Sequence, residues 1–465
     1  MLPGIVVGPA ESLCLTKRSA SETATDPNFS SIKEVDMTRC CSIPQCVLFG
    51  STALAFIITS TALAGYPAEN VVLRSHLPLS DFGASFAEDC WGYVSDSGEE
   101  YAIIGLSNGT GFVRITDPDN PVIVDVVLTP NRGRDMKVYQ HYVYSSSDSG
   151  PTHVIDVAEI DNNVVTLVNS LGGGTHNIFI NEQSGFLYAS IGGPMVVLDL
   201  ADPLNPVFVG SWDSQAHDAT VITYPEGPYA GREIAFVFAG SNGRVDIVDV
   251  TDKSDMFLLG SATYPSPAYT HQGWPSDDLQ YLYVSDELDE VNGQPRTRTL
   301  VFDISDLANP TYVNFVSSGL PSTDHNLYVR DGFIFEANYT SGLRIFDTAN
   351  PVFPAQVGYF DTYPANNDAG FSGAWTAYPF FPSGMVIVSD RSGGLFILDP
   401  SEAVGGGGKC SAADLDGDGD VDAADLAMLL GAWGPNPGHS ADFDGDGFVN
   451  AFDLAQLLGD WGPCG

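Results

Sequence analysis

The sequence predicts an all-β protein, a seven-bladed β-propeller closed by an N-terminal strand, followed by a small α-helical module. Three observations lead to this prediction. A strand-rich pattern recurs every 42 to 54 residues between positions 112 and 400. The 465 residues include 49 Gly and 30 Pro, which suits many short strands joined by turns. Amphipathic helical segments occur only beyond residue 410.

The charge balance excludes two classes of partner. Asp and Glu number 59 against 18 Lys and Arg, so the formal net charge is −41. A nucleic-acid binder needs a basic surface, and so does a protein that docks on anionic lipid. Only 17% of residues are charged, so the acidity reflects a shortage of Lys and Arg rather than a disordered acidic tail.

Residues 1–64 are predicted to be a leader that ends in a signal peptide. Cys46–Ala64 is apolar and uncharged, follows Arg39, and closes with a small-x-small tripeptide typical of a signal-peptidase site. We expect cleavage after Ala64 and a secreted or cell-surface protein without a transmembrane helix. A retained anchor is the alternative, although the run is barely long enough to span a bilayer. Met37 is an alternative start, because it would give an ordinary short n-region.

Export changes how the seven cysteines are interpreted. Four of them fall in the leader, and the mature chain keeps Cys90, Cys410 and Cys464. We expect Cys410 and Cys464 to form a disulfide bond, because they bracket one small module in an oxidising compartment. Closing that loop would stabilise the module by about 4 kcal/mol. Cys90 is interpreted as a buried small hydrophobic residue.

The central repeat is an apolar strand that ends at or near an Asp, then a turn and a second strand. The aligned positions are Arg114, Asp156, Asp199, Asp249, Asp303, Asp347 and Asp399. Their spacing fits four-stranded propeller blades over residues 65–400. The seventh copy lacks its outer strand, and residues 70–77 (NVVLRSHL) are predicted to supply it and close the ring. Six or eight blades are the alternatives.

Four copies also carry a D-x-x-N-P turn. It opens at Asp117, Asp202, Asp306 and Asp347. We expect these carboxylates to accept backbone N–H bonds and hold the turn rather than to act in catalysis.

A second register, about 20 residues after each repeat position, carries polar and aromatic residues. In a propeller it lies where each inner strand begins, so it becomes a ring around one mouth of the central channel. Its members are Trp91, Arg134-Asp135, His176-Asn177, His217-Asp218, His271-Gln272, Asp324-His325 and Trp375. Loops carrying Asp286, Glu287, Asn338 and Asp390 are expected on the same face.

Two interpretations of this ring compete. In one, each polar side chain bonds the neighbouring blade and clamps it. In the other, the ring binds a ligand or a transition metal. The candidate catalytic residues are His217, Asp218, His271, His325, Asp286 and Glu287. The candidate ligand-binding residues are Trp91, Asp135, His176, Asn338, Trp375 and Asp390.

Eight phrases in this region resemble the LVIVD-repeat proteins called choice-of-anchor B. They are THNIFI, AHDATV, YTHQGW, SDELDE, DHNLYV, NYTSGLRIFD, GAWTAYP and SDRSGGLFILD. The resemblance covers most of residues 66–400. It implies an exported bacterial propeller whose C-terminal anchoring module varies, and it implies no particular reaction.

A Gly-rich linker (401–409) precedes two similar units, 28 residues apart, within residues 410–465. Each places oxygen ligands at loop positions 1, 3, 5, 9 and 12 with Gly at position 6, and position 7 offers its carbonyl, which is the EF-hand arrangement for Ca²⁺. The ligands are Asp414, Asp416, Asp418, Asp420, Asp422 and Asp425, then Asp442, Asp444, Asp446, Phe448, Asn450 and Asp453. The sequence predicts that two Ca²⁺ ions drive the folding of this module.

The two units resemble a dockerin domain, and the WGPCG ending resembles the GC type. This resemblance implies a cohesin-like or cell-envelope partner. Loop positions 10 and 11, which help to contact cohesin, are Ala423-Ala424 and Ala451-Phe452 instead of the Ser-Thr type. Six apolar residues are expected to form the small core of the module. They are Leu429, Leu430, Trp433, Leu457, Leu458 and Trp461.

The leading functional hypothesis is a surface-tethered binding or scaffold propeller, docked by its calcium module. The alternative is an extracellular hydrolase or lyase that acts on polysaccharide, with a His/Asp site at the channel mouth. A third hypothesis is ligand sensing without turnover. In each case the ligand is a carbohydrate or another polar molecule, because aromatic side chains accompany the polar ring.

Overall fold

A computed structural model describes residues 65–190, 192–405, 413, 415, 420–436, 439–443, 447–459 and 461–463. The predicted signal peptide, the cleavage site at Ala64, the alternative start at Met37 and the Cys410–Cys464 bond lie outside these residues. So do several predicted calcium ligands, which are Asp414, Asp416, Asp418, Asp444 and Asp446.

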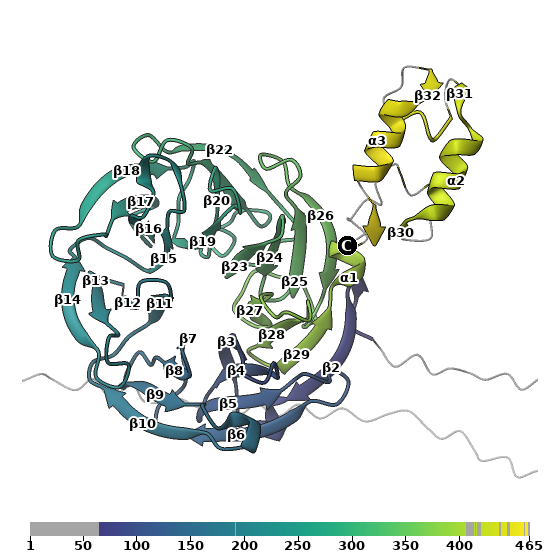
Figure 1. Cartoon of the computed structure of the whole chain (residues 1–465). Coiled ribbons are helices and arrows are strands. Elements are labelled where there is room, and N and C mark those ends of the chain that lie inside the picture. The colour runs from purple at the N-terminus through teal and green to yellow at the C-terminus, as the bar shows by residue number, and fades with distance from the viewer. Residues whose placement is uncertain are drawn as a thin grey trace, which may run out of the picture. The chain divides into compact units, whose positions relative to one another are not determined.

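Seven antiparallel sheets form the blades of a propeller, as predicted, and Figure 1 shows them arranged in a ring. The innermost strand of each sheet comes first in its blade. These strands are β3 (Ala87–Val94), β7 (Met136–Tyr139), β11 (Asn177–Asn181), β15 (Asp218–Thr223), β19 (Thr270–Pro275), β23 (Leu327–Arg330) and β27 (Ala374–Tyr378). Each contacts the next around the ring, and β27 contacts β3, so all seven run side by side around one axis.

The second and third strands of each blade are almost wholly buried. The second strands are β4 (Glu100–Leu106), β8 (Tyr142–Ser145), β12 (Phe186–Ser190), β16 (Glu233–Phe238), β20 (Tyr281–Asp286), β24 (Phe333–Ala337) and β28 (Val386–Asp390). The third strands are β5 (Gly109–Arg114), β9 (Thr152–Asp156), β13 (Met195–Asp199), β17 (Arg244–Asp249), β21 (Thr299–Asp303), β25 (Leu343–Asp347) and β29 (Gly394–Asp399). Their apolar residues pack against the neighbouring blade and form the core.

The outer strands complete the blades and close the ring. They are β6 (Val122–Leu128), β10 (Thr166–Leu171), β14 (Val207–Trp212), β18 (Phe257–Thr263), β22 (Thr311–Val316), β26 (Ala355–Phe360) and the N-terminal β2 (Val72–Pro78). The predicted closing strand is therefore present, since β2 pairs with β29 from Val72↔Asp399 to Pro78↔Gly394. In addition β1 (Ala68–Glu69) pairs with β26, so the N-terminal segment fastens two blades.

The repeat Asp residues hold turns, as predicted. At the ends of β13, β21 and β25, the carboxylates of Asp199, Asp303 and Asp347 each accept the N–H two residues on, at 2.8, 3.0 and 2.7 Å. Asp202 and Asp306, at the start of D-x-x-N-P turns, do the same at 3.1 and 3.0 Å. Asp156, Asp249 and Asp399 make the same bond, so it recurs at all six repeat Asp residues and explains them without chemistry.

Helices are few and short. The propeller carries η1 (Leu79–Phe82), η2 (Ile160–Asn162), η3 (Gly227–Tyr229) and α1 (Ser401–Val404). The C-terminal module has α2 (Ala423–Gly431) and α3 (Ala451–Gly459), with two small sheets that pair β30 (Asp420–Val421) with β33 (Gly462–Pro463) and β31 (Gly434–Pro435) with β32 (Phe448–Val449). None of the helices in the described residues is long and apolar enough to cross a membrane.

Only two of the six residues predicted for the core of the C-terminal module are buried. Leu429 and Leu457 are buried, together with Val421 and Val449. Four others are about half exposed, because two nine-residue helices can bury only one face each. They are Leu430 at 52%, Trp433 at 48%, Leu458 at 52% and Trp461 at 47%.

Candidate functional site

Three histidines from successive blades meet at the end of the axis where the inner strands begin. His217 immediately precedes β15, His271 lies in β19, and His325 stands just before β23. The ring centroids of His217 and His271 are 4.4 Å apart, and those of His271 and His325 are 4.3 Å apart. With Glu287, from the segment after β20, we call these residues the histidine cluster.

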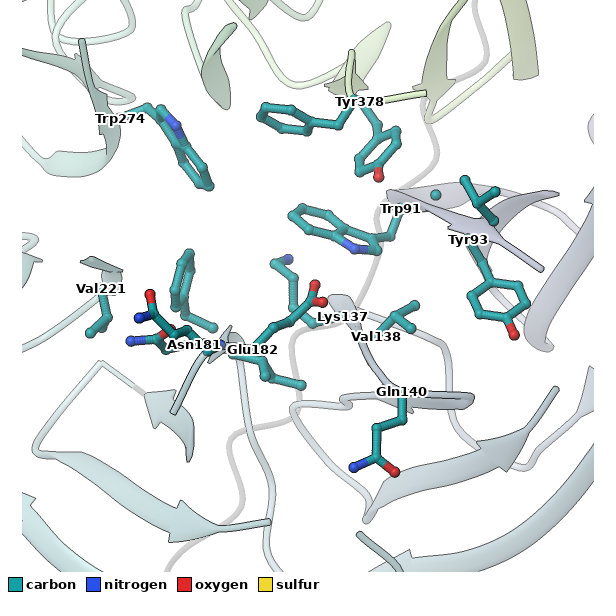
Figure 2. Close-up of a pocket in the computed structure, with 16 residues that line it drawn as sticks. Trp91, Tyr93, Lys137, Val138, Gln140, Asn181, Glu182, Val221, Trp274 and Tyr378 are labelled. Carbon is teal, nitrogen blue, oxygen red and sulfur yellow. Dashed lines mark hydrogen bonds between the residues drawn. The ribbon is translucent and has the colours of Figure 1, made fainter. Parts of the chain in front are cut away.

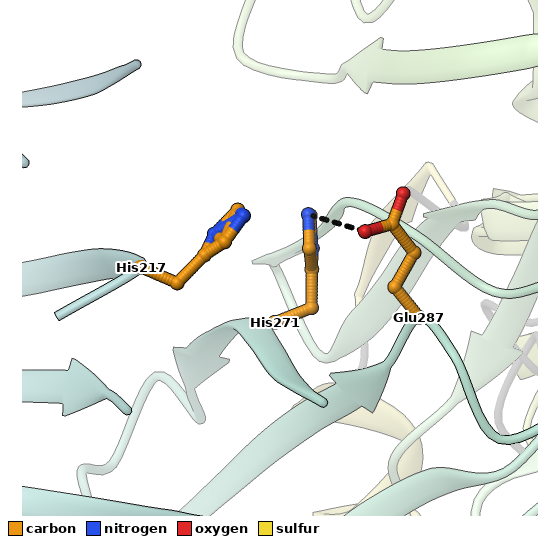
Figure 3. A group of neighbouring side chains, drawn as sticks. All are labelled: His217, His271 and Glu287. Atoms are coloured by element: carbon orange, nitrogen blue, oxygen red, sulfur yellow. Dashed lines mark ion pairs between the residues drawn. The ribbon is translucent and has the colours of Figure 1, made fainter. Parts of the chain in front are cut away.

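Glu287 faces two of the rings, one with each carboxylate oxygen. Its Oε2 lies 3.6 Å from Nε2 of His271, and its Oε1 lies 3.6 Å from Nε2 of His325. Figure 3 shows His217, His271 and Glu287 directed toward one another. The hydroxyl of Tyr339 donates to Glu287 Oε1 at 2.7 Å, which fixes the carboxylate.

Hydrogen bonds also set the orientation of two rings. Nδ1 of His325 lies 2.7 Å from the carbonyl oxygen of Trp375, so it carries a proton and leaves Nε2 with its lone pair toward Glu287. The amide of Asn177 contacts Nδ1 of His217 at 3.3 Å and the carbonyl oxygen of that residue at 3.1 Å. No described residue hydrogen-bonds Nδ1 of His271.

Burial keeps the three rings neutral. It lowers the pKa of His271 to about 3 and holds the pKa values of His217 and His325 well below the ordinary value. Burial also raises the pKa of Glu287, and the hydrogen bond from Tyr339 opposes this. Neutral imidazoles are available as bases or as metal ligands at neutral pH.

A charged network lies beside the cluster, and we call it the rim network. Arg134 donates to Glu88 Oε1 at 3.1 Å and to Nε2 of His176 at 2.8 Å. His176 in turn pairs with Asp148, which also binds Arg132. These five residues form one chain of contacts, so His176 belongs to an ion-pair network and not to the histidine cluster.

Trp375 joins the two groups of residues. Its ring centroid lies 4.5 Å from that of His325. The guanidinium groups of Arg134 and Arg391 lie 4.5 and 5.0 Å from its ring centroid. Trp375 therefore lies at the predicted mouth, with cation–π contacts to two arginines.

The clamp interpretation holds for the second residue of three pairs in the ring, Asp135, Asn177 and Gln272. Asp135 accepts the N–H of Ile178 at 2.6 Å, across to the next blade. Gln272 donates to the carbonyl of Leu327 at 3.0 Å and accepts its N–H at 2.9 Å. Asp89, Asn177 and Asn326 bond the next blade in the same way. The two competing interpretations therefore apply to adjacent residues of one strand.

Asp218 and Lys137 lie in the layer beneath the cluster. Lys137 pairs with Asp135 and lies 3.5 Å from Asp89. Burial, followed by the charge of Asp135, raises the pKa of Asp218 to about 8. A cavity of about 20 Å³ lies in this layer, room for about one water-sized particle.

Three predicted residues lie outside the cluster. Asp286 is fully buried and accepts hydrogen bonds from the N–H groups of Ala268 and Tyr269 at 2.7 and 2.6 Å, so it fastens a loop. Asn338 donates to Glu336 inside a turn. Asp390 accepts two turn N–H groups at 2.8 and 2.7 Å. These placements assign Asp286, Asn338 and Asp390 structural contacts rather than a position at the mouth.

The prediction placed Trp91 at the wrong end of the axis. The residues of this blade that match His271-Gln272 are Glu88-Asp89, because each pair lies within the register shift of its first strand, between Ala87 and Cys90 in β3 and between Thr270 and Gly273 in β19. Glu88 was not among the predicted site residues. The acidic pair directly before Cys90, Glu88-Asp89, could have indicated a polar position at the mouth. The fifth ring pair is also shifted by one residue, because His325 faces the mouth while Asp324 accepts backbone N–H bonds at 3.0 and 3.1 Å.

Trp91 instead lines a second hollow, at the other end of the inner strands, which we call the aromatic pocket. The pocket has a volume of about 480 Å³. Figure 2 shows Trp91, Trp274 and Tyr378 around it, with Lys137 and Glu182 at its edge. Nζ of Lys137 lies 4.4 Å from the ring centroid of Trp91. Flat apolar walls with a few polar groups are typical of small-molecule sites.

The calcium module places its two closing carboxylates alike. Asp425 accepts the N–H of Leu415 at 2.7 Å and of Asp422 at 2.8 Å. Asp453 accepts the N–H groups of Phe443 and Asn450 at the same two distances. Both carboxylates are buried. Oδ1 of Asp442, at loop position 1, is buried with no hydrogen-bond partner among the described residues, as expected for a cation ligand.

Comparisons with known proteins identify one segment of the chain. Residues 412–458 match the Dockerin type I domain family. No curated protein matches the chain significantly. A solved protein from Lactobacillus plantarum is 14% identical with a TM-score of 0.46, over 65% of this chain and 88% of its own. A functionally unknown protein from Desulfotomaculum acetoxidans is 11% identical with a TM-score of 0.46, over 62% and 88%.

Proposed function

We propose that this chain is an exported, surface-docked binding protein. Its C-terminal module attaches it to a cohesin-like or cell-envelope partner, and its propeller presents ligand sites at the two ends of the axis. The observation that carries the proposal is the Dockerin type I match over residues 412–458. Two further parts of this proposal are still predictions from the sequence. They are the resemblance of the propeller to LVIVD-repeat proteins and the cleavage of a signal peptide.

The loop geometry supports calcium binding by the module. The closing residues Asp425 and Asp453 make the same pair of backbone hydrogen bonds in the two units. Ca²⁺ would be held by the side chains at loop positions 1, 3, 5, 9 and 12 and by the carbonyl at position 7. Its charge would offset the repulsion among the Asp residues, which we propose makes folding of the module depend on two ions.

An exposed apolar surface supports docking through the two helices. Leu430 and Trp433 recur 28 residues later as Leu458 and Trp461, and all four side chains are about half exposed. Phe452, at a loop position that resembles the cohesin-contacting ones, is 76% exposed. Apolar side chains left exposed at equivalent positions of both units are typical of an interaction surface.

Deletion of residues 410–465 tests the docking role. The truncated protein is expected to be released from the cell surface, whereas the intact chain stays bound and is released by a calcium chelator. A matched test replaces Trp433 and Trp461 with Ala and keeps the calcium ligands. That variant should still bind Ca²⁺ but lose its partner. Equal surface retention of the truncated and intact chains would contradict the anchoring role.

The aromatic pocket supports a carbohydrate as the propeller ligand. Trp91, Trp274 and Tyr378 offer flat apolar faces for stacking on a sugar ring, and Asn181 and Glu182 offer hydrogen-bonding groups at the edge. A ligand of this kind agrees with a docked extracellular protein. Binding is tested by titrating the intact chain with soluble oligosaccharides and following the Trp fluorescence.

The second candidate function is a polysaccharide hydrolase or lyase that uses the histidine cluster. The observation that favours it is a buried neutral His271 beside Glu287, a pair able to move a proton. Replacing His271 and His325 together with Ala should abolish any such activity on a panel of polysaccharides. Unchanged turnover in that double variant rules the cluster out as an active site.

A further inference from the structure

We propose that the histidine cluster is a binding site for one divalent transition-metal ion, with His217, His271 and Glu287 as ligands and His325 at the second oxygen of Glu287. The three ligands each offer an atom within 4.8 Å of the others. They come from separate segments of the chain, so the propeller itself brings them together. This site is separate from the calcium loops and does not depend on the docking function.

The contacts within the cluster are too long to be hydrogen bonds. Nε2 of His271 and Nε2 of His325 each lie 3.6 Å from an oxygen of Glu287. An ion pair would need a charged imidazole, and burial of rings only 2–3% exposed disfavours it. Ligands of one zinc ion, each about 2.0–2.2 Å from the metal, stand roughly 3.3–3.6 Å apart in a tetrahedral site. The separations of His271 and His325 from Glu287 agree with this spacing, and the atom that His217 offers lies within 4.8 Å of those of His271 and Glu287.

The tautomers of the rings decide which nitrogens can bind a cation. Because the carbonyl of Trp375 accepts the proton of Nδ1 in His325, Nε2 of that ring offers a lone pair toward Glu287. The amide NH₂ group of Asn177 donates to Nδ1 of His217, so that nitrogen holds the lone pair of a neutral ring. His271 is 3% exposed and its Nδ1 has no hydrogen-bond partner among the described residues. A cation with two positive charges suits a carboxylate surrounded by neutral imidazoles.

The surroundings hold the carboxylate ligand in place. The hydroxyl of Tyr339 donates to Glu287 at 2.7 Å. Tyr339 is fully buried and has a φ of +37°, a region that non-glycine residues rarely adopt. Strain of this kind persists where the neighbouring structure requires it, and here it points the phenol at the carboxylate. Hydrogen-bonded support of a ligand is a regular feature of protein metal sites.

Nearby charges do not prevent a cation from binding. Arg134 is the closest positive group, and it is engaged by Glu88 and His176. Three rim arginines, Arg132, Arg134 and Arg391, stand against the carboxylates of Glu88, Asp148 and Glu287. The layer beneath adds three more carboxylates and only Lys137. The local charge is therefore balanced or negative.

The donor set selects the class of metal. Imidazole nitrogens with one carboxylate suit zinc, iron, cobalt, nickel or copper, whereas calcium and magnesium prefer oxygen ligands alone. Zinc and cobalt are the appropriate probes, because cobalt occupies zinc sites and reports its ligands by visible absorption. Saturating calcium keeps both probes out of the Asp-rich loops.

The test uses the full chain, stripped of metal and then saturated with Ca²⁺. We expect it to bind one equivalent of Co²⁺ with the absorption bands of nitrogen coordination, and one Zn²⁺ to displace it. His271→Gln and Glu287→Gln should abolish the bands. Tyr339→Phe, a positioning variant, should weaken Zn²⁺ binding about 10–100-fold and leave the bands in place. His153→Gln changes a buried histidine of another blade and should behave as the parent.

Thermal unfolding of each variant shows whether it folds. Glu287→Gln keeps the shape of the side chain and an acceptor for the hydroxyl of Tyr339. This variant therefore tests the metal site even if His271→Gln does not fold. Absence of Co²⁺ bands in the calcium-saturated parent overturns the proposal. So does a binding constant that Glu287→Gln and Tyr339→Phe leave unchanged. Neither result affects the docking role, which is tested on residues 410–465.

Discussion

Replacement of Asp286 by Asn should destabilise the propeller without touching the histidine cluster directly. The buried carboxylate accepts hydrogen bonds from Ala268 N–H at 2.7 Å, Tyr269 N–H at 2.6 Å and the hydroxyl of Tyr264 at 2.9 Å. With its oxygen at the Oδ2 position, the amide of Asn keeps the bonds from Ala268 and Tyr264 and turns its NH₂ group toward the N–H of Tyr269. One charge-assisted bond is lost and a buried donor is left unpaired, so we expect the free energy of unfolding to fall by about 1.5–3 kcal/mol.

Urea unfolding of the two proteins, followed by Trp fluorescence, measures this change. The matched control is Asp303→Asn, which alters a solvent-accessible turn where Ser305 donates at 3.0 Å. Water can replace that bond, so the control should lose far less stability. If Asp286→Asn proves no more harmful than Asp303→Asn, the fastening role inferred for Asp286 is wrong. A large loss confirms that this residue acts in folding, contrary to its prediction as a catalytic candidate.

Three further predictions concern other parts of the chain. Asp425→Asn and Asp453→Asn should each remove about one of two bound Ca²⁺ ions, measured by calorimetric titration, and an unchanged stoichiometry would contradict the closing role. Trp274→Ala should weaken oligosaccharide binding by about 1–2 kcal/mol if sugars stack in the aromatic pocket, and equal affinity would exclude that surface. Burial raises the pKa of Glu336 to about 7. The folded state then binds more protons than the unfolded state between about pH 4.5 and 7, so this group makes stability fall as pH rises through that window. In the Glu336→Gln variant this fall in the free energy of unfolding, about 3 kcal/mol, should be absent. Urea unfolding of the parent and the variant at both ends of this pH window measures it.

The fold could be predicted because its signals are local and repeated. Each of Asp199, Asp303 and Asp347 bonds an N–H only two residues away, so the turn can be read from a few letters. Seven repetitions then establish the repeat length. A propeller of seven blades also needs a closed ring, so the incomplete last blade must receive a strand from elsewhere in the chain. The pairing of β2 with β29 followed from one missing strand. The pairing of β1 with β26 was not predicted, because no repeat lacks a strand that β1 would have to replace.

The candidate site was harder to predict because displacements of one to three residues decide it. Glu88 lies at the mouth where Trp91 was predicted, and it falls inside the register shift between Ala87 and Cys90. The spacing of the repeats varies by more than such a displacement and does not reveal it. The aromatic pocket depends on the far ends of several inner strands, where the repeat pattern is weak. In the C-terminal module, Trp433 and Trp461 were assigned to a core that two short helices are too small to build.

Adjacent residues in this propeller divide structural and chemical roles. In the third, fifth and sixth blades, Asn177, Gln272 and Asn326 bond the neighbouring blade, while the preceding residue in each case is a histidine at the mouth. Asp286 and Glu287 repeat the division, since one fastens a loop and the next faces the imidazoles. A strand alternates its faces from residue to residue, so one position can serve the blade contact while its neighbour stays free for ligands. Substitutions of Gln272 and Asn326 should therefore change stability, whereas those of His271 and Glu287 should change metal affinity at nearly constant stability.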